Sequence, residues 1–269
     1  MPILEIEIHI PINDNAVLWR YIDFQKYESM LNTGALYFCR ADKFSDPFEC
    51  SVPRKETDFR ESEEHFRSTE RVFKKSGGTF DKEHAKKQST DRAATHIKIK
   101  RATTVNCWHI NTGESDAMWQ LYLKDNEGVA IKTTAGKLRK VLAGVKQQIG
   151  MSKVRYLDYE NGIWFHDTEY PHPYYNFITP IFHKRLAFDH ESELRLYHHD
   201  YQREKDGYWE NLDNPKGELI ELNVAELVEE IIFHPTSDAI AQQKVVNAAK
   251  KTGYNFKFQK SKMNAEPGY

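Results

Sequence analysis

The stretch FDHESELRL, Phe188–Leu196, is typical of a β-strand, and we expect the strand to span residues 188–197. Alternate side chains of a strand point to opposite faces, so Glu191, Glu193 and Arg195 are expected on one face. The two glutamates would then stand about 6.5–7 Å apart along the backbone. Two carboxylates so placed can stabilise a sugar cation during glycosyl transfer or hold a divalent metal with a third acid. A solvated strand face with a Glu–Arg ion pair explains the same pattern.

Composition limits the classes of protein to which the chain can belong. The 269 residues have a net charge of −2, which argues against a protein dedicated to nucleic acid or to a membrane surface, although a local basic patch is compatible with it. No apolar run approaches the roughly 18 residues that span a bilayer. Cys39, Cys50 and Cys107 form no Cys-x-x-Cys pair. We therefore expect a reduced, cytoplasmic protein that does not contact the membrane.

Hydrophobic patterning predicts a mixture of strands and helices. Few strand pairs have the spacing of a parallel crossover, so we expect a single α+β domain over residues 1–269 with a mostly antiparallel sheet core. The expected strands are 1–12, 18–21, 35–38, 103–110, 128–134, 153–159, 188–197, 217–223, 228–235 and 255–261. The expected helices are 23–34, 114–125, 135–149 and 237–253, and Asp23 and Gly34 are the expected cap and stop of the first.

Residues 54–101 have a different character from the rest of the chain. They are dense in charged residues and broken by Gly77-Gly78, which predicts two polar helices flanking the glycines. We interpret the segment as a solvated, charged helical insertion. Its second helix, 82–101, is basic, so a cap over a cleft and a surface for nucleic acid are the alternative interpretations.

Arg20 is the first candidate for ligand binding. It lies in the apolar and aromatic run VLWRY, where a buried guanidinium needs a carboxylate or an anionic ligand. Phosphate suits it, because the planar guanidinium presents two parallel donors. An ion pair with Asp46 or Glu49 is the structural alternative. Lys184, a few residues before the glutamates, would lower their mutual repulsion and keep both ionised.

Aromatic and histidine residues add weaker signals. Trp119 and Tyr122 lie on the expected helix 114–125, where most aromatics are core residues but one can stack on a flat ring. The histidines, including His198-His199, lack the recurring spacing of zinc ligands, so we predict no metal site.

Three segments together carry a resemblance to a known family. They are LWRYIDFQKYESMLNTGALYFCRADKFSDPFE (18–49), CWHINTGESDAMWQLYLKDNEGVAIKTT (107–134) and HKRLAFDHESELRLY (183–197). In this order they resemble a bacterial family known as domain of unknown function 2971, whose name declares no activity. The resemblance covers about three-quarters of the chain and leaves 54–101 as a variable insertion.

A more distant resemblance, to ADP-ribosyltransferases, implies a chemistry. An aromatic-flanked arginine on the first strand is followed much later by Glu-x-Glu, as in those enzymes. The resemblance implies that NAD is the substrate, that Arg20 contacts its phosphate or ribose, and that Glu193 stabilises the developing cation. Glu191 would orient or deprotonate the acceptor, and Tyr37 would replace the missing Ser-Thr-Ser strand. The residues then expected to contact NAD are Arg20, Tyr21, Tyr37, Asp46, Trp119, Tyr122 and Lys184.

The ADP-ribosyltransferase resemblance implies a bacterial toxin or a phage-defence effector with an unidentified acceptor, which can be a protein, a nucleic acid or a small molecule. A metal-dependent nuclease is the first alternative, with Asp46, Glu49, Glu191 or Glu193 as metal ligands beside Lys184. The second alternative is a non-catalytic module that binds a nucleotide, a nucleic acid or a protein. In that module the basic insertion would carry the function.

Overall fold

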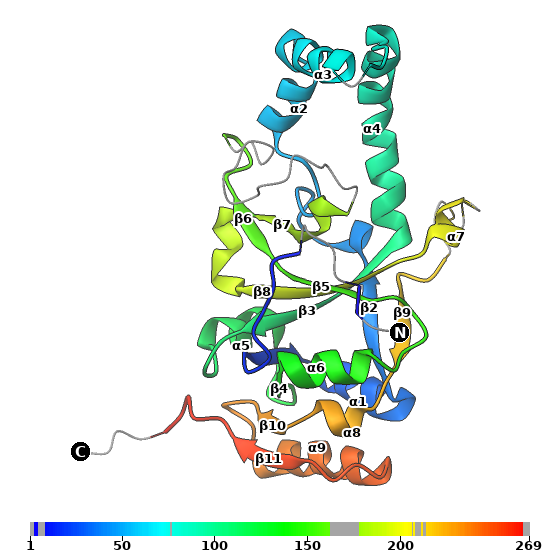
Figure 1. Cartoon of the computed structure of the whole chain (residues 1–269). Coiled ribbons are helices and arrows are strands. Elements are labelled where there is room, and N and C mark those ends of the chain that lie inside the picture. Colours follow the sequence, from blue (N-terminus) through cyan, green and yellow to red (C-terminus); the bar gives the residue numbers. More distant parts are fainter. Residues whose placement is uncertain are drawn as a thin grey trace.

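The computed structural model describes residues 3–4, 9–75, 77–161, 178–205, 207, 211 and 214–265. A branched nine-stranded sheet runs through the body of the molecule (Figure 1). The strands of this sheet are β1 Val17–Ile22, β2 Ala35–Arg40, β3 Thr103–Ile110, β4 Val129–Thr134, β5 Gly150–Lys153, β8 Glu193–His199, β9 Gly217–Glu221, β10 Glu230–Phe233 and β11 Lys257–Lys260. A second, two-stranded sheet consists of β6 Arg155–Leu157 and β7 His183–Arg185.

The main sheet has the order β11–β10–β4–β1–β3–β2–β9, with β8 paired to β3 and β5 paired to β8. Among the described strands of this sheet, only β10 and β11 pair in parallel. The other pairs are antiparallel. The predicted α+β fold with a mostly antiparallel sheet is therefore confirmed at this level.

The first helix, α1 Phe24–Thr33, shows how local sequence sets the element boundaries. The Asp23 side chain accepts a hydrogen bond from the Lys26 amide at 2.8 Å and caps the helix. Gly34 ends it with φ of 60°, a left-handed conformation that glycine adopts at little cost. Both caps were predicted from the sequence. The chain then turns directly into β2.

The sheet forks at β3. β8 pairs along one edge of β3 from Thr103 to His109. The other edge is shared, because β1 pairs with its end at His109 and β2 with its start at Val105. Asn106, at the point of divergence, donates its side-chain amide to the Tyr37 carbonyl at 2.9 Å. The fork leaves an opening in the sheet between β1 and β2.

Helices cover the sheet on both faces. The larger core contains Leu18 and Ile22 of β1 and apolar residues of α1, α6 Ala135–Leu142, α8 Val224–Leu227 and α9 Ala239–Lys251. On the opposite face, α5 Asp116–Tyr122 packs against Trp19 and Tyr21. No helix in the described part of the chain is long and apolar enough to cross a membrane.

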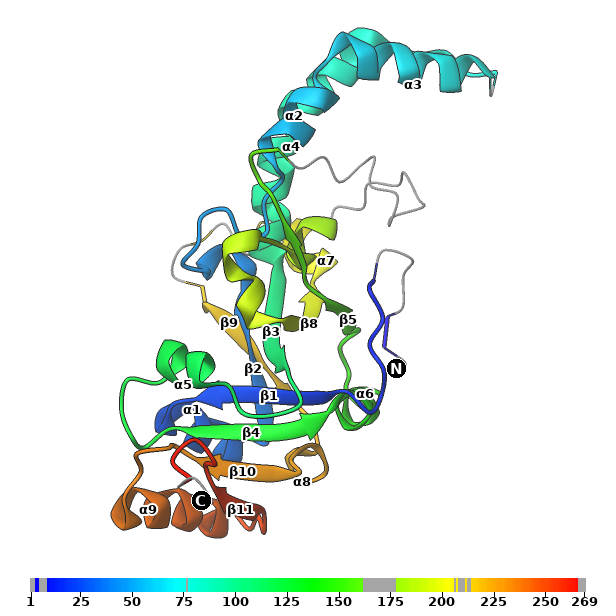
Figure 2. The same cartoon turned by 90° about the vertical axis from the view of Figure 1, so that its left-hand side faces the viewer.

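The insertion forms a helical arm that projects from the body (Figure 2). It consists of α2 Arg54–Arg60, α3 Glu63–Lys75 and α4 Lys82–Ala102. The two predicted helices that flank Gly77-Gly78 are thus present, and α2 is an additional one. The base of α4 is anchored by Ile99, which is buried in a small core cluster, and by Lys100, whose Nζ donates to the Glu49 carbonyl at 2.8 Å.

The predicted strand over 188–197 is wrong in its first half. Residues Leu186–Glu191 form a 3₁₀-helix, η4, and β8 begins only at Glu193. Ser192 lies between them with φ of 38° and ψ of 61°, and this left-handed residue interrupts the alternation on which the prediction depended. Glu191 and Glu193 therefore belong to different elements.

Other boundaries shift more modestly. The expected strand 153–159 is shortened to β6, with β5 ending at Lys153 before it, and the expected helix 135–149 ends at Leu142. The strand expected at 1–12 lies partly outside the described residues, and its described part forms no named strand. Two other 3₁₀-helices are η1 Ala41–Lys43, which follows β2, and η3 Thr179–Phe182, which precedes β7.

Candidate functional site

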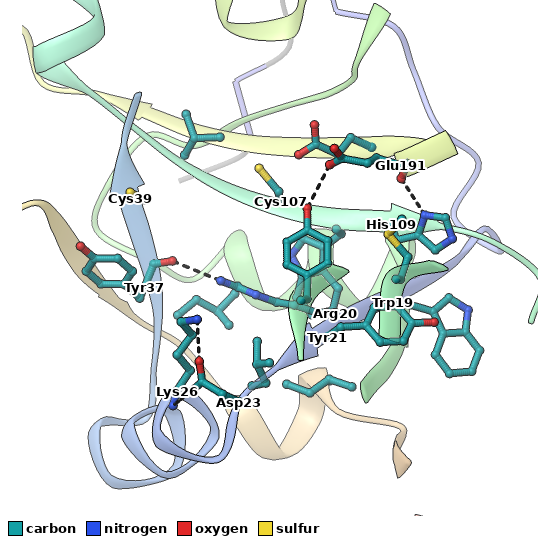
Figure 3. Close-up of a pocket in the computed structure, with 18 of the residues that line it drawn as sticks. Trp19, Arg20, Tyr21, Asp23, Lys26, Tyr37, Cys39, Cys107, His109 and Glu191 are labelled. Carbon is teal, nitrogen blue, oxygen red and sulfur yellow. Dashed lines mark hydrogen bonds and ion pairs between the residues drawn. The ribbon is translucent and has the colours of Figure 1, made fainter. Parts of the chain in front are cut away.

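A pocket of about 670 Å³ lies at the fork of the sheet (Figure 3). Side chains from β1, α1, β2, β3, α5, η4 and β8 line it. Because β1 and β2 diverge from the same edge of β3, the pocket receives residues from both faces of the sheet. Among the residues singled out in the sequence, it brings together Arg20, Tyr21, Tyr37, Asp46, Glu49, Tyr122, Lys184, Glu191 and Glu193.

Arg20 is the cation of the pocket that lacks an acidic partner among the described residues. Its guanidinium lies 5.8 Å from the centre of the Trp108 ring, and Nη2 donates weakly to the Tyr37 carbonyl at 3.4 Å. Nη1 is buried with no hydrogen-bond partner in the described part of the chain. Burial lowers the pKa of Arg20 to about 10, so it remains charged at neutral pH.

The proposed ion pair of Arg20 with Asp46 or Glu49 is wrong. Asp46 instead accepts two hydrogen bonds from Arg185, each 3.0 Å long. Glu49 forms its ion pairs with Lys184 and Arg195. Both acids are therefore neutralised elsewhere, which leaves Arg20 available to an anionic ligand.

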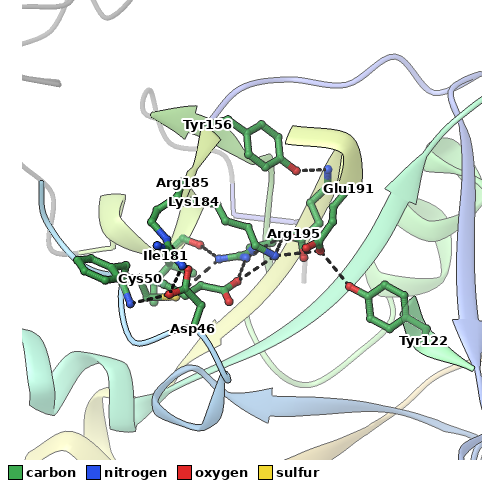
Figure 4. Close-up of polar contacts among 12 residues, drawn as sticks. Asp46, Cys50, Tyr122, Tyr156, Ile181, Lys184, Arg185, Glu191 and Arg195 are labelled. Carbon is green, nitrogen blue, oxygen red and sulfur yellow. Dashed lines mark hydrogen bonds and ion pairs between the residues drawn. The ribbon is translucent and has the colours of Figure 1, made fainter. Parts of the chain in front are cut away.

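A buried network of charges forms the opposite wall of the pocket (Figure 4). Arg195 is completely buried, and its Nη2 donates to Glu193 Oε2 at 2.8 Å and also contacts Glu49. Lys184 Nζ lies 2.9 Å from Glu191, 3.5 Å from Glu193 and 3.6 Å from Glu49. The network thus combines three carboxylates with two cations.

This network keeps Glu193 ionised although only 5% of its surface is exposed. Burial alone would raise the pKa of Glu193, but the charges of Arg195 and Lys184 outweigh burial and lower it. The glutamates are buried, so the interpretation of a solvated strand face is wrong, but the Glu–Arg ion pair that belonged to it is present between Glu193 and Arg195. The predicted role of Lys184, a cation beside both glutamates, matches its contacts.

Glu191 reaches the pocket from the end of η4. Its Oε2 accepts hydrogen bonds from Tyr122 Oη and Lys184 Nζ, both at 2.9 Å. Burial and the neighbouring glutamates raise the pKa of Tyr122 far above its usual range, so Tyr122 is a hydroxyl donor at any physiological pH. Glu191 and Glu193 are thus held next to each other by a shared lysine and not by strand alternation.

Trp119 is the expected NAD-contacting residue that is absent from the pocket lining. It is buried on α5, with its ring 4.9 Å from that of Tyr21 and its Nε1 donating to Glu114 at 3.1 Å. Among the lining residues that were not predicted as site residues are Cys107 and His109. Burial raises the pKa of the Cys107 thiol well above its usual value, so it does not act as a thiolate.

Comparison with protein-family models and with curated proteins finds no match for this chain. The resemblances noted in the sequence therefore stay predictions.

We expect Arg195 to be essential for stability. Arg195→Met removes a buried cation while leaving Glu193 and Glu49 buried, so unfolding in urea should require about 3–5 kcal/mol less free energy. Arg54→Met, on the exposed surface of α2, is the matched control and should change stability by less than about 0.5 kcal/mol. An Arg195→Met protein as stable as the wild type would contradict the importance assigned to the network.

His183 should make the protein less stable in acid. Burial, together with the nearby charges of Arg155 and Arg195, lowers its pKa to about 3. Below pH 6.5 the unfolded chain binds a proton that the folded chain does not. The free energy of unfolding should then fall by up to about 1.4 kcal/mol per pH unit from this group as the pH drops.

The measurement is urea denaturation at pH 7, 6 and 5 for the wild type and for His183→Leu. The variant should show the shallower loss of stability with falling pH, whatever its absolute stability. Parallel slopes for the two proteins would mean that His183 is not buried in its neutral form.

Proposed function

We propose that the pocket binds NAD and that the protein transfers ADP-ribose from NAD to an acceptor. The observation that carries the proposal is the pairing of two features in one pocket. One is Arg20, a cation with a buried N–H that has no partner among the described residues, and the other is Glu193, a buried carboxylate held in its ionised form. A diphosphate and a developing sugar cation are the two charged parts of this substrate.

Arg20 would bind the diphosphate. The guanidinium offers parallel donors that match phosphate oxygens, and a site screened from water strengthens the attraction. The Arg20 side chain lies on the face of the sheet that carries Leu18 and Ile22. Glu193 lies on the opposite face, which carries Trp19. Both nevertheless line the same pocket, because the fork opens the sheet between them. A volume of about 670 Å³ lies within the usual range for sites of small ligands and cofactors.

Glu193 would stabilise the positive charge that develops on the ribose as nicotinamide leaves. Cleavage of the bond between ribose C1′ and nicotinamide passes through an oxocarbenium-like state, which a fixed carboxylate stabilises. The buried network has one more carboxylate than cations, so its residual negative charge favours this state. Lys184 and Arg195 hold the carboxylate in position and do not neutralise the group as a whole.

Tyr37 would offer a flat surface to one of the rings of the substrate. Its ring lies across Gly217 on β9, where a Cβ would come within 2.5 Å of the Tyr37 hydroxyl. Tyr37 is 44% exposed and lines the pocket. Aromatic faces held in this way are suited to stacking on planar groups.

The metal-dependent nuclease is the weaker alternative. Glu49, Glu191 and Glu193 already have Lys184 or Arg195 as partners, and a divalent ion would have to displace them. Among the described residues, no three His, Cys, Asp or Glu side chains are arranged to hold a metal ion.

Cys39, Cys50 and Cys107 are free thiols, which supports the proposal that the reaction takes place in the cytoplasm.

The central test is release of nicotinamide from NAD by the purified protein. Glu193→Gln should slow release by about 10²–10³-fold, because it removes the charge that stabilises the transition state. Arg20→Ala should weaken NAD binding in calorimetry by about tenfold to a hundredfold, because it removes a charge-assisted contact. Glu28→Gln and Arg54→Ala, both on the exposed surface, are the matched controls and should behave as the wild type.

Circular dichroism and urea unfolding of each variant separate loss of activity from loss of folding. Absence of both NAD binding and NAD cleavage in the wild type would overturn the transferase. Binding without cleavage would favour the non-catalytic module. Tight binding of Mg²⁺ or Mn²⁺ that is lost in Glu193→Gln would favour the nuclease.

We further propose nucleic acid as the acceptor, held by the helical arm. Residues 54–101 contain 14 Lys and Arg against 9 Asp and Glu, although the whole chain has a net charge of −2. Positive charge is therefore concentrated on the arm, and this is the electrostatic feature that phosphate backbones recognise. The exposed basic side chains of α3 and α4 include Arg67, Arg71, Lys74, Lys75, Lys82, Lys86, Lys87 and Lys98.

Charge reversal tests this surface. Lys86→Glu combined with Lys87→Glu should weaken binding of a fluorescent oligonucleotide. It should also reduce the slope of log K against log salt by about 0.7–0.9 for each lost phosphate contact. Lys250→Glu with Lys251→Glu, at the exposed end of α9, changes the net charge equally and should have a smaller effect. Equal effects of the two pairs would show that the arm is not the binding surface.

A further inference from the structure

His109 is a buried imidazole of the pocket whose protonation is fixed by its surroundings. It lies near the end of β3, is 8% exposed and lines the pocket. Its Nδ1 lies 2.6 Å from the Glu191 carbonyl oxygen (Figure 3). A carbonyl oxygen only accepts hydrogen bonds, so Nδ1 must carry the hydrogen. In the neutral ring Nε2 then has a free lone pair.

Nε2 has no hydrogen-bond partner among the described residues, and it is buried. A buried acceptor without a donor is costly, and such atoms in native proteins call for an explanation. His109 lines the pocket, so a group bound in the pocket is the natural donor to Nε2. An N–H or O–H of a second substrate would satisfy this lone pair.

The acids of the pocket are poorly suited to accept a proton. Glu191, the base implied by the sequence resemblance, is bonded to Tyr122 and Lys184. Glu193 is held by Arg195 and Lys184. The charges of these two cations lower the pKa of Glu193. His109 Nε2 has no such partner in the part of the chain that the structure describes.

The position of His109 also suits a base. It lies directly opposite Glu193 across β3 and β8, and opposite Trp19 across β3 and β1. Directly opposite residues of antiparallel strands have Cβ atoms about 4.5–5.5 Å apart on the same face. The titratable groups that face the imidazole are Glu191 and Glu193 from the side of β8 and Tyr21 from β1, with ring centres 6.4 Å apart. The carboxylates would stabilise the imidazolium once it forms.

We infer that His109 is the general base that deprotonates the acceptor, an inference that rests on the proposed transferase function. An acceptor oxygen or nitrogen uses its lone pair to form a bond to C1′ of the ribose. The bond from C1′ to the nicotinamide nitrogen breaks, and its electron pair neutralises the pyridinium ring. The proton of the acceptor passes to His109 Nε2 and later to water. Glu193 stabilises the sugar cation, and Glu191 positions His109 through its carbonyl.

The test compares a nucleophile that must lose a proton with one that need not. Methanol needs a base to attack C1′, whereas the azide anion does not. His109→Asn keeps an N–H donor at the position of Nδ1 and removes the base. We expect formation of methyl ADP-ribose from NAD to fall by about 10²–10⁴-fold in this variant. Formation of ADP-ribosyl azide should stay at the wild-type rate.

Two further variants complete the comparison. His109→Gln, which also lacks a base, should give the same loss of methanolysis with azide reactivity retained. His234→Asn alters a histidine outside the pocket lining, bonded to Thr236, and should leave both reactions unchanged. Equal loss of the methanol and azide reactions in His109→Asn would overturn the inference while leaving the transferase intact. A wild type that neither binds nor cleaves NAD would overturn the proposed function itself.

A spectroscopic measurement tests the inference independently of turnover. In protein labelled with ¹⁵N-histidine, the signal that disappears in His109→Asn should show the neutral ring protonated at Nδ1. Protonation at Nε2 would overturn the inference, because the lone pair would then point at the Glu191 carbonyl.

Discussion

The buried guanidinium of Arg195 is the constraint on which the site depends. It joins β8 through Glu193, the loop after β2 through Glu49, and η3 through the Ile181 carbonyl, which accepts from Nη1 at 2.7 Å. Glu49 lies 146 residues from Arg195 in the sequence, and the segments converge because each supplies an oxygen to one planar cation. Without that cation the carboxylates would have to take up protons or move out to water. The charge of the pocket is thus a product of the same contacts that hold this part of the fold together.

The fork at β3 determines where a ligand can enter. A regular sheet would place Arg20 and Glu193 on opposite faces, separated by backbone. Divergence of β1 from β2 opens the sheet between them, and the Asn106 side chain occupies the Tyr37 carbonyl that a neighbouring strand would otherwise bind. The site therefore depends on a place where β1 and β2 do not pair. The Asn106 side chain stabilises it by supplying the hydrogen-bond donor that a paired strand backbone would otherwise provide.

The sequence predicted the fold class and several boundaries, because these depend on local signals such as the Asp23 cap and Gly34. It did not predict the turn at Ser192, since a left-handed serine has no pattern of its own. The role of Lys184 was visible because it lies close to the glutamates in sequence. The sequence could not show which nitrogen of His109 carries the hydrogen, because this depends on the Glu191 carbonyl, 82 residues away. Trp119 would have the same spacing on its helix whether it lined a pocket or packed in the core, so its spacing could not predict which of the two it does.

The arm has the properties of a spacer. Its base touches the body through Ile99 and Lys100, next to Glu49, while α3 and the outer part of α4 stand clear of the sheet (Figure 2). Each helical turn added to or removed from both α3 and α4 would move the tip by about 5.4 Å without altering the contacts at the base. Helix length can therefore set the reach of the arm independently of the pocket. Chains that share this body can differ in how far from the pocket they hold a bound partner.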